Sequence, residues 1–340
     1  MLRLSRCALF TLLFAWGCAK SPEPSGNDSG GAQPSAGSRG GSPSSGSAGT
    51  TGSSGGSTAS GGRSSQGGTT SSGSGGTTGS SGGTTAASSS TPSPDDFTPG
   101  PASSCNATTG QGNLSSQYQR AHVTCNGKDY VVQNNAWGSS AGQTVTYGPG
   151  TKFKVTVQNG TGNNGAPASY PSLYIGDNGG EKSTGGILPK PLSSMGKVPT
   201  AWTWAANGAT GDYNAAYDVW FSTSNSGDNS SSMPSGGYLM VWFYKPLKQQ
   251  PIGQIIAVGD IGGKSWNIWF GNNSNGKPCI SYVAAQALNS LSFDLNMFIK
   301  DAIARGKVQS SWSLTNVFAG FEIWSGGVGL ETTDFAVTVP

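Results

Sequence analysis

The sequence predicts an all-β fold, a β-jelly roll made of two antiparallel sheets with one short helix and a concave cleft. Short segments of alternating apolar and polar residues begin at Ala121 and are separated by turns rich in Gly, Asn, Pro and Ser. Many short strands joined by such turns are typical of a sandwich or jelly roll. A single segment, residues 295–307, instead has apolar residues at helical spacing. Strands therefore dominate the predicted fold, and one helix packs on them.

Each element is predicted from its own local pattern. In the helical segment, Asp294 is placed as the N-cap and Gly306 lies near the C-terminal end. The apolar positions of this helix are Leu295, Phe298, Ile299, Ala302 and Ile303. The expected strands include residues 152–158, 216–223, 238–245, 255–259, 265–270, 280–284, 314–324 and 335–339.

Composition divides the chain into a leader, a linker and one domain. Of the 340 residues, 55 are Gly, and most of the Gly excess lies before residue 97. Residues 19–96 are mainly Gly, Ser and Thr with almost no apolar side chains, so they cannot offset the entropy cost of ordering. We expect them to form a flexible, disordered linker. Residues 97–340 remain as one large all-β domain.

The charge of the chain argues against a nucleic-acid partner. The formal net charge is +3, and charged residues make up 10% of the chain, below the usual share of about a quarter. The surface must then be rich in Ser, Thr, Asn, Gly and aromatic side chains, which suits neutral ligands with many hydroxyl groups. Composition alone is equally compatible with a surface that binds nothing. No cofactor and no metal site is expected, because pairs such as Asp177 and Asn178 fit ordinary turn chemistry.

The first 18 residues have the pattern of an export signal. Arg3 and Arg6 precede an apolar run, residues 7–17, which is too short to span a bilayer. The run ends at Cys18 after Ala-Trp-Gly, which resembles the bacterial lipoprotein box, although the bulky Trp16 departs from it. Two outcomes stay open. A lipidated Cys18 would anchor an outer-membrane or cell-surface lipoprotein, and otherwise the protein is secreted.

Export makes disulfide bonds possible. Cys7 leaves with the signal and Cys18 is the candidate lipid anchor, so Cys105, Cys125 and Cys279 remain. Cys105 and Cys125 lie close in sequence at the start of the domain, and we expect them to close a short loop. Such a bridge stabilises the fold by roughly 3 kcal/mol. Cys279 lies in an apolar strand and is expected to be a buried small side chain.

The predicted strands have two different faces, because successive side chains alternate across a strand. One face is plainly apolar and is expected to pack between the sheets. The other face mixes aromatic, polar and single carboxylate side chains, and it is expected to line a cleft where Trp and Tyr rings stack on sugars. The mixed face consists of Gln133, Asn135, Trp137, Asp218, Trp220, Tyr238, Met240, Trp242, Tyr244, Glu322 and Trp324. For any single Trp, a place in the core is the alternative.

Six short motifs in the right order resemble glycoside hydrolase family 12. Each motif alone is weak, but six in order are a strong signal, and the resemblance runs from about residue 105 to residue 339. The motifs are Val-Val-Gln-Asn-Asn-Ala-Trp-Gly (131–138), Ala-Tyr-Asp-Val-Trp (216–220), Leu-Met-Val-Trp-Phe (239–243), Pro-Ile-Gly (251–253), Gly-Lys-Ser-Trp (263–266) and Gly-Phe-Glu-Ile-Trp (320–324).

The resemblance implies a jelly roll that hydrolyses internal β-1,4 bonds of cellulose-like glucans or xyloglucan with retention of configuration. A retaining mechanism uses two carboxyl groups, a nucleophile and an acid/base. Glu322 matches the acid/base of the family, and Asp218 matches the Asp that supports the nucleophile. The positions that match sugar-binding residues are Asn135, Trp137, Met240, Trp242 and Pro251. The implied partner is therefore a β-glucan polysaccharide, and the domain is expected to act as a monomer.

The sequence departs from the family at one position. Tyr238 stands where the resemblance places the nucleophilic Glu, and no carboxylate lies beside it. Three interpretations follow. Asp218 could activate water in an inverting or weakened hydrolase. Tyr238 could itself be the nucleophile, which requires activation of a phenol with an ordinary pKa near 10. Alternatively, catalysis is lost and the cleft only binds glucan, and a surface structural role is the remaining possibility.

Overall fold

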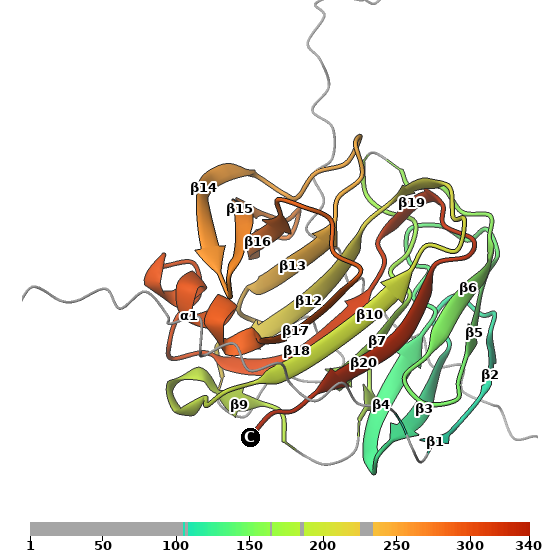
Figure 1. Ribbon diagram of the computed structural model, residues 1–340, viewed down its shortest axis with the longest axis horizontal. Coiled ribbons are helices and arrows are strands. Elements are labelled where there is room, and N and C mark those ends of the chain that lie inside the picture. Colours follow the sequence, from blue (N-terminus) through green and yellow to red (C-terminus); the bar gives the residue numbers. More distant parts are fainter. Residues whose placement is uncertain (1–104, 106–107, 164, 184–186, 225–233) are drawn as a thin grey trace, which may run out of the picture. The chain divides into compact units, whose positions relative to one another are not determined.

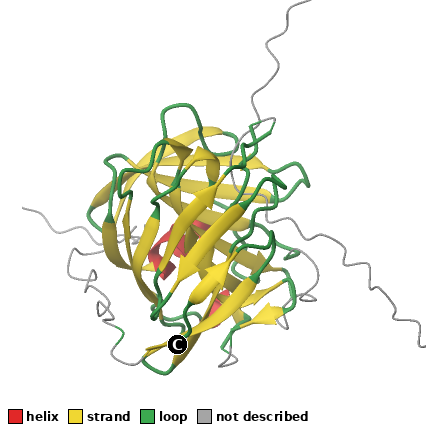
Figure 2. Cartoon of the chain, turned by 90° about the vertical axis from the view of Figure 1, so that its right-hand side faces the viewer, coloured by secondary structure: helices red, strands yellow, loops and turns green. Residues whose placement is uncertain are grey.

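The computed structural model describes residues 105, 108–163, 165–183, 187–224 and 234–340. Strands dominate this part of the chain, and helices are small (Figure 2). The predicted signal segment, Cys18 and the predicted linker lie outside the described residues. In chain order the elements are β1 (Thr108–Thr109), β2 (Gly112–Leu114), β3 (Arg120–Cys125), β4 (Lys128–Gln133), β5 (Gln143–Tyr147), β6 (Phe153–Gln158), β7 (Ser172–Asn178), β8 (Glu181–Lys182), β9 (Lys190–Pro191), the 3₁₀ turn η2 (Leu192–Ser194), β10 (Pro199–Ala205), β11 (Gly211–Tyr213), β12 (Ala215–Ser222), β13 (Tyr238–Tyr244), β14 (Gln254–Ile261), β15 (Lys264–Asn272), β16 (Pro278–Ala284), β17 (Ser290–Asp294), α1 (Leu295–Ala304), β18 (Ser313–Gly320), β19 (Ile323–Gly326) and β20 (Glu331–Val337).

Two main sheets and one small ribbon form the domain (Figure 1). The large sheet has the order β1-β3-β4-β7-β18-β12-β13-β16-β15-β14, with β8 and β9 paired at its side. The second sheet has the order β17-β10-β20-β6-β5-β2, and β11 pairs with β19 in the ribbon. Neighbouring strands are antiparallel except β13 and β16, which pair in parallel. The predicted jelly roll of two sheets is confirmed.

The core lies between the two sheets. Trp202 of β10 is fully buried, and its ring centroid lies 5.6 Å from that of Tyr217 and 5.3 Å from that of Phe243 in the facing sheet. Its indole nitrogen donates to Thr332 Oγ1, so no polar atom of this side chain is left unpaired. Burial of aromatic side chains of this size is a main source of stability in such a core.

The predicted helix is observed as α1, with the predicted ends. The Asp294 side chain accepts a hydrogen bond from the backbone N–H of Asn296, as an N-cap does. At the other end Gly306 has a φ of +68°. Its N–H donates to the Ile303 carbonyl while Lys307 N–H donates to the Ala302 carbonyl. This is the pattern of a Schellman motif, which stops the helix after Arg305.

The predicted faces of β12 and β13 are confirmed with one exception. Leu239, Val241 and Phe243 lie in the core between the sheets, while Met240 lies on the opposite face. Tyr244 was expected with Met240, but it packs against the core beside Tyr213. The cause is a shift of register between β12 and β13, where Ala215 pairs with Tyr244 but Ala216 pairs with Trp242. A bulge of this kind moves one side chain to the other face of the sheet.

The expected strand over residues 314–324 is divided into β18 and β19. The break falls at Phe321 and Glu322, whose backbone groups form hydrogen bonds with residues outside the strands of the large sheet. Phe321 N–H donates to the Pro171 carbonyl, and the Glu322 carbonyl accepts from Asn214 N–H. Glu322 therefore lies outside both strands, at the junction between the large sheet, which contains β18, and the small ribbon of β11 and β19.

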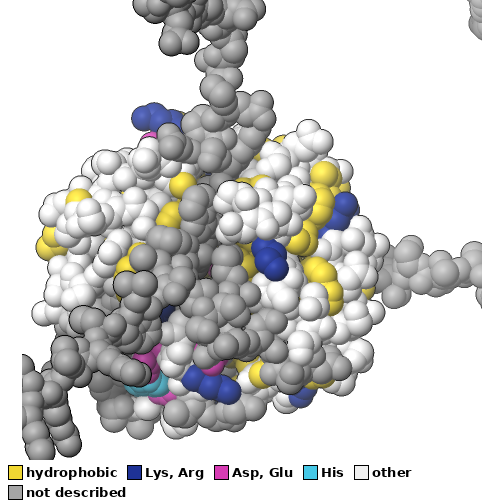
Figure 3. Space-filling model, turned by 180° about the vertical axis from the view of Figure 1, so that it is seen from behind, with side chains coloured by type: hydrophobic (Ala, Val, Ile, Leu, Met, Phe, Trp, Pro, Cys, Tyr) yellow, Lys and Arg dark blue, Asp and Glu magenta, His cyan; other side chains and the backbone are white. Residues whose placement is uncertain are grey.

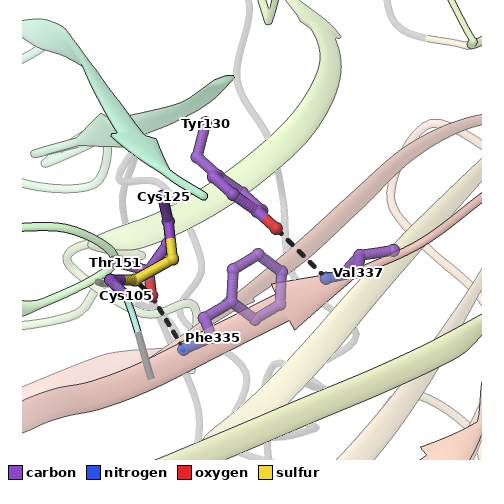
Figure 4. The surroundings of a disulfide bond; sticks show 6 residues. All are labelled: Cys105, Cys125, Tyr130, Thr151, Phe335 and Val337. Carbon is purple, nitrogen blue, oxygen red and sulfur yellow. Dashed lines mark hydrogen bonds between the residues drawn. A yellow bond between two sulfur atoms is a disulfide. The ribbon is translucent and has the colours of Figure 1, made fainter. Parts of the chain in front are cut away.

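A disulfide joins Cys105 and Cys125, with Cα atoms 5.0 Å apart (Figure 4). It closes a loop over a sequence separation of 20 residues. Nearby, Thr151 Oγ1 accepts from Phe335 N–H and lies 3.7 Å from Cys105 Sγ. The bridge thus fixes the start of the domain against β3 and next to β20. Among the described residues, no helix is long and apolar enough to cross a membrane.

Candidate functional site

The face of the large sheet that points away from the core carries its own aromatic cluster, which we call the outer-face cluster. Its side chains come from β4, β7, β12, β13, β16, β18 and β19 and from the loop before β7. The members are Val131, Tyr170, Tyr174, Ala216, Trp220, Tyr238, Met240, Trp242, Cys279, Val283, Phe318 and Trp324, with Trp269 packed against them. Seen from behind, the described surface is mostly neutral and carries few charged side chains (Figure 3). An aromatic, weakly charged face of this kind suits a neutral, hydroxyl-rich ligand.

Two carboxyl groups lie among these aromatic side chains. Asp218 stands in the middle of β12 and is 2% exposed, and Glu322 follows β18 and is fully buried. Burial raises the pKa of Asp218 to about 7. Burial, and then the charge of Asp218, raise the pKa of Glu322 to about 8. The two groups therefore interact, and near neutral pH Glu322 holds a proton while Asp218 is partly ionised.

Asn214 holds Glu322 in place. The Asn214 amide nitrogen donates to Glu322 Oε2 at 2.5 Å, and the Asn214 side-chain oxygen accepts from Glu322 N–H at 2.9 Å. The backbone N–H of Asn214 also donates to the Glu322 carbonyl. These bonds join the end of β11 to the start of β19 and fix the carboxyl group of Glu322.

Tyr238 lies beside this pair but offers no carboxylate. Its ring stacks on Trp220, with centroids 4.1 Å apart and planes 9° apart, because the two residues are opposite each other on β12 and β13. Tyr238 is 1% exposed, and burial is the main cause that raises the pKa of its phenol well above 10. The Asn273 amide opposes this shift. The phenol is therefore neutral across the physiological pH range.

Several polar atoms around the pair are buried without a hydrogen-bond partner among the described residues. They are Asp218 Oδ1, Glu322 Oε1, Trp242 Nε1 and Trp269 Nε1. Buried polar groups are normally paired, and a group left unpaired costs about 1–3 kcal/mol. The set includes both donors and acceptors, which are the partners that the hydroxyl groups of a sugar require.

The remaining residues predicted for sugar binding have different locations. Asn135 is buried with a φ of +44°, and its amide donates to the Tyr170 carbonyl at 3.4 Å. Trp137 is buried in the loop after β4 and is not a member of the outer-face cluster. Pro251 is buried in the loop between β13 and β14. The structure thus groups Met240 and Trp242 with Tyr238 in the outer-face cluster.

Two residues of the site were missed from the sequence. Asn214 directly precedes the Ala-Ala-Tyr-Asp segment of β12, but nothing local indicates that it meets Glu322, 108 residues away. Tyr170 belongs to the outer-face cluster, and its hydroxyl donates to the Ala216 carbonyl at 2.9 Å. Tyr170 lies in a loop before β7, where no alternation of side chains predicts which way it points.

A jelly roll with two interacting buried carboxyl groups on an aromatic sheet face has the features of a glycoside hydrolase. The comparisons with known proteins agree. The pattern of glycosyl hydrolase family 12 matches residues 128–340, and the chain belongs to this family. No group of three or more potential metal ligands occurs in the part of the chain that the structure describes.

Individual relatives cover most of the domain. A probable xyloglucan-specific endo-beta-1,4-glucanase A of Aspergillus terreus is 28% identical over 219 residues, which cover 62% of this chain and 82% of the relative. Endoglucanase A of Aspergillus kawachii is 29% identical over 230 residues, covering 65% and 90%. Among solved structures, endoglucanase cel12A from Rhodothermus marinus has a TM-score of 0.62 at 34% identity and covers 67% of this chain and 99% of its own.

Proposed function

We propose that this protein is an endo-acting glycoside hydrolase of β-1,4-glucans, of the cellulose or xyloglucan type, in which Glu322 is the general acid. The observation that carries the proposal is the buried pair of Asp218 and Glu322, with pKa values raised to about 7 and about 8. Two interacting carboxyl groups without full hydrogen bonding destabilise a fold, and such perturbed pairs cluster at catalytic sites. The substrate class follows from the family and from relatives named for xyloglucan and glucan hydrolysis.

The mechanism we propose is a single displacement. Protonated Glu322 gives its proton to the glycosidic oxygen as the bond to the anomeric carbon breaks. Ionised Asp218 accepts a proton from a water molecule whose oxygen forms the new bond at the opposite face of the sugar. Each turnover consumes one water and inverts the anomeric carbon, and this mechanism needs carboxyl groups about 6.5–9.5 Å apart.

A covalent mechanism through Tyr238 is disfavoured. We place Tyr238 at the nucleophile position of the family on the strength of the Leu-Met-Val-Trp-Phe motif that follows it. A phenol attacks efficiently only when it is ionised or when a base removes its proton. Here burial raises the pKa of the phenol, and the nearby charges of Asp218 and Glu322 raise it further. The ring is also held in the stack with Trp220.

That stack favours a second candidate function, glucan binding without turnover. The stacked rings of Trp220 and Tyr238 are buried and place no reactive group at the position of the nucleophile. The unpaired indole N–H groups of Trp242 and Trp269 would serve such binding equally well. In this case the Asp218–Glu322 pair would only donate and accept hydrogen bonds.

Reducing-sugar release from xyloglucan, carboxymethyl-cellulose and mixed-linkage glucan separates the two functions. A hydrolase releases sugar from at least one glucan and loses the activity in Glu322→Gln and in Asp218→Asn. Proton NMR of the first product then shows the inverted anomer. A binding protein shows no turnover but is retarded in glucan-containing gels, and Glu322→Gln leaves that retardation unchanged. No retardation and no turnover across the panel would refute both functions.

We also propose that the protein acts outside the cytoplasm. The support is the signal-like segment 1–18 and the Gly/Ser/Thr-rich stretch 19–96, which would place the domain at a distance from a membrane. We favour lipidation of Cys18 over free secretion. Metabolic labelling with a radioactive fatty acid tests this: wild type is labelled and Cys18→Ala is not, whereas an unlabelled wild type found in the medium shows secretion.

A further inference from the structure

Three hydrogen bonds join Asn214 to Glu322. Asn214 donates two of them and accepts the third. The Asn214 backbone N–H donates to the Glu322 carbonyl at 2.9 Å. The Asn214 side-chain oxygen accepts from Glu322 N–H, and its amide nitrogen donates to Glu322 Oε2. Asn214 is fully buried, so water does not compete for these bonds.

The donor and acceptor groups around the Asn214 side chain determine which of its two terminal atoms is the oxygen and which is the nitrogen. A backbone N–H can only donate, so the side-chain atom that faces Glu322 N–H must be the oxygen. The atom that faces Glu322 Oε2 is then the NH₂ group, which can only donate. Oε2 must therefore be the accepting oxygen in both protonation states of Glu322.

These bonds determine which carboxyl oxygen of Glu322 carries the proton when the group is neutral. A neutral carboxyl group carries its hydrogen on one oxygen, and its carbonyl oxygen is a much stronger acceptor than its hydroxyl oxygen, so the bond from the Asn214 amide favours Oε2 as the carbonyl oxygen. The other oxygen, Oε1, is buried and has no partner among the described residues. We propose that Asn214 is a positioning residue that confines the acid proton of Glu322 to Oε1, the oxygen that faces the substrate. This inference rests on the proposed role of Glu322 as general acid.

The fold provides this arrangement through the small ribbon of β11 and β19. Tyr213 at the end of β11 pairs with Ile323 at the start of β19. Asn214 and Glu322 are the next residue along each strand, so the ribbon brings them together. The carboxyl group is thus oriented by one amide rather than by the large sheet on which Asp218 stands.

Isotope labelling gives a direct test, because the chain contains only four glutamates: Glu23, Glu181, Glu322 and Glu331. With carboxyl-¹³C glutamate, the Glu322 signal is assigned by its loss in Glu322→Gln. We expect the wild-type signal to titrate at a raised pKa. In Asn214→Ala we expect a further rise, because the amide N–H that stabilises the carboxylate is gone.

Infrared difference spectra of the same labelled protein locate the proton. If Oε1 carries it, Oε2 is the carbonyl oxygen that accepts from Asn214, and Asn214→Ala raises the C=O stretching frequency of protonated Glu322. If Oε2 carries it, the carbonyl oxygen has no bond to lose and the frequency stays the same. An unchanged frequency in Asn214→Ala would therefore overturn the proposal whatever the pKa does, and neither measurement needs a turning-over enzyme.

Kinetics supply the functional arm where wild type turns over. Asn214→Asp is nearly isosteric, but it places a carboxylate oxygen against Oε2 and draws the proton of Glu322 there. For natural glucans we expect kcat to fall by about 10²-fold, within the usual contribution of a general acid, with little change in KM. A dinitrophenyl glycoside, whose leaving group needs no proton, should lose far less. Equal losses on both substrates would contradict an effect through the proton.

A matched control separates positioning from folding. Asn296 is also a buried asparagine, and it donates to the carbonyls of Met195 and Gly196 beside α1. Asn296→Ala removes a comparable set of bonds away from Glu322. It should lower thermal stability without moving the Glu322 titration or its infrared band. A Glu322 titration that moved as far in Asn296→Ala as in Asn214→Ala would show that the effect is general loosening.

Discussion

The rings of Trp220 and Tyr238 stack 4.1 Å apart and nearly parallel, across the two strands that carry the centre of the outer-face cluster. Asp218 lies two residues before Trp220 on the same strand and the same face. The site therefore combines an aromatic stack, a carboxyl group of raised pKa and the separately held Glu322.

Substitution of Tyr238 distinguishes the proposed chemistries. Tyr238→Glu adds a carboxylate at the proposed nucleophile position, and we expect glucan hydrolysis to rise by several orders of magnitude with retention of configuration. Tyr238→Phe keeps the stack but removes the hydroxyl, and it should leave any wild-type activity unchanged. A loss of activity in Tyr238→Phe would instead identify the phenol as the nucleophile.

The pH dependence of activity follows from the raised pKa values of the pair. The mechanism needs Asp218 ionised, which requires a pH above about 7, and Glu322 protonated, which requires a pH below about 8. We expect a narrow, bell-shaped profile of kcat/KM centred between these values. A profile with its optimum near pH 5 would show that the pair titrates in the ordinary carboxyl range.

The same pair should make the free energy of unfolding change with pH in the direction opposite to that caused by most carboxyl groups. Both pKa values are higher in the folded than in the unfolded chain, so the unfolded chain binds fewer protons between about pH 4 and pH 8. The free energy of unfolding therefore falls as pH rises through this window, by at most about 1.4 kcal/mol per pH unit for each group. Denaturation of wild type and Glu322→Gln should show the variant gaining relative stability towards pH 8.

Trp242 should contribute a hydrogen bond to glucan binding. Trp242→Phe keeps a ring on the outer face but removes the indole N–H that has no partner among the described residues. We expect a loss of affinity of about 10-fold, measured by calorimetry with a soluble glucan oligosaccharide. Trp266→Phe is the matched control, because its N–H donates to the Ile261 carbonyl within the core. It should reduce stability and leave affinity unchanged.

His122 of β3 links Asp129 of β4 and Glu181 of β8, and the strength of this link depends on pH. Its ring nitrogens contact Asp129 at 2.9 Å and Glu181 at 2.6 Å. Partial burial lowers the pKa of His122, but the hydrogen bonds and charges of Asp129 and Glu181 outweigh it, so the net pKa is raised. This link is fully present below about pH 6.5 and is lost as pH rises through the folded pKa.

Hydrogen exchange over the hairpin of β7 and β8 measures the effect of His122. Protection should decrease as pH rises above the raised pKa, after correction for intrinsic exchange, because Glu181 lies on β8. His122→Ala should remove this pH dependence. Protection that changes equally in wild type and variant would show that His122 does not hold the hairpin.

Much of the fold was predictable because it depends on local patterns. The alternation around Asp218 and around Met240 correctly assigned both faces of β12 and, apart from Tyr244, those of β13. The helix ends at Asp294 and Gly306 were set by side-chain and backbone chemistry within a few residues. Such features need no knowledge of strand pairing.

The unpredicted features depend on partners distant in sequence. Tyr244 changed face because of a bulge in its pairing with β12, and no residue of β13 alone encodes that bulge. Asn214 meets Glu322 only because β11 pairs with β19. Trp137 lies beyond the end of β4 at Gln133, and Asn135 between them has a positive φ, so the alternation of a strand does not extend to Trp137.

The ribbon of β11 and β19 makes the two halves of the site independent. Glu322 and Asn214 belong to this ribbon, whereas Tyr238 stands on β13 of the large sheet. A change at position 238 leaves the hydrogen bonds between Asn214 and Glu322 in place, and acts on the Glu322 carboxyl group only through charge. Under the proposed role of Glu322, one substitution at position 238 would change the second reacting group without removing the bonds that orient the first.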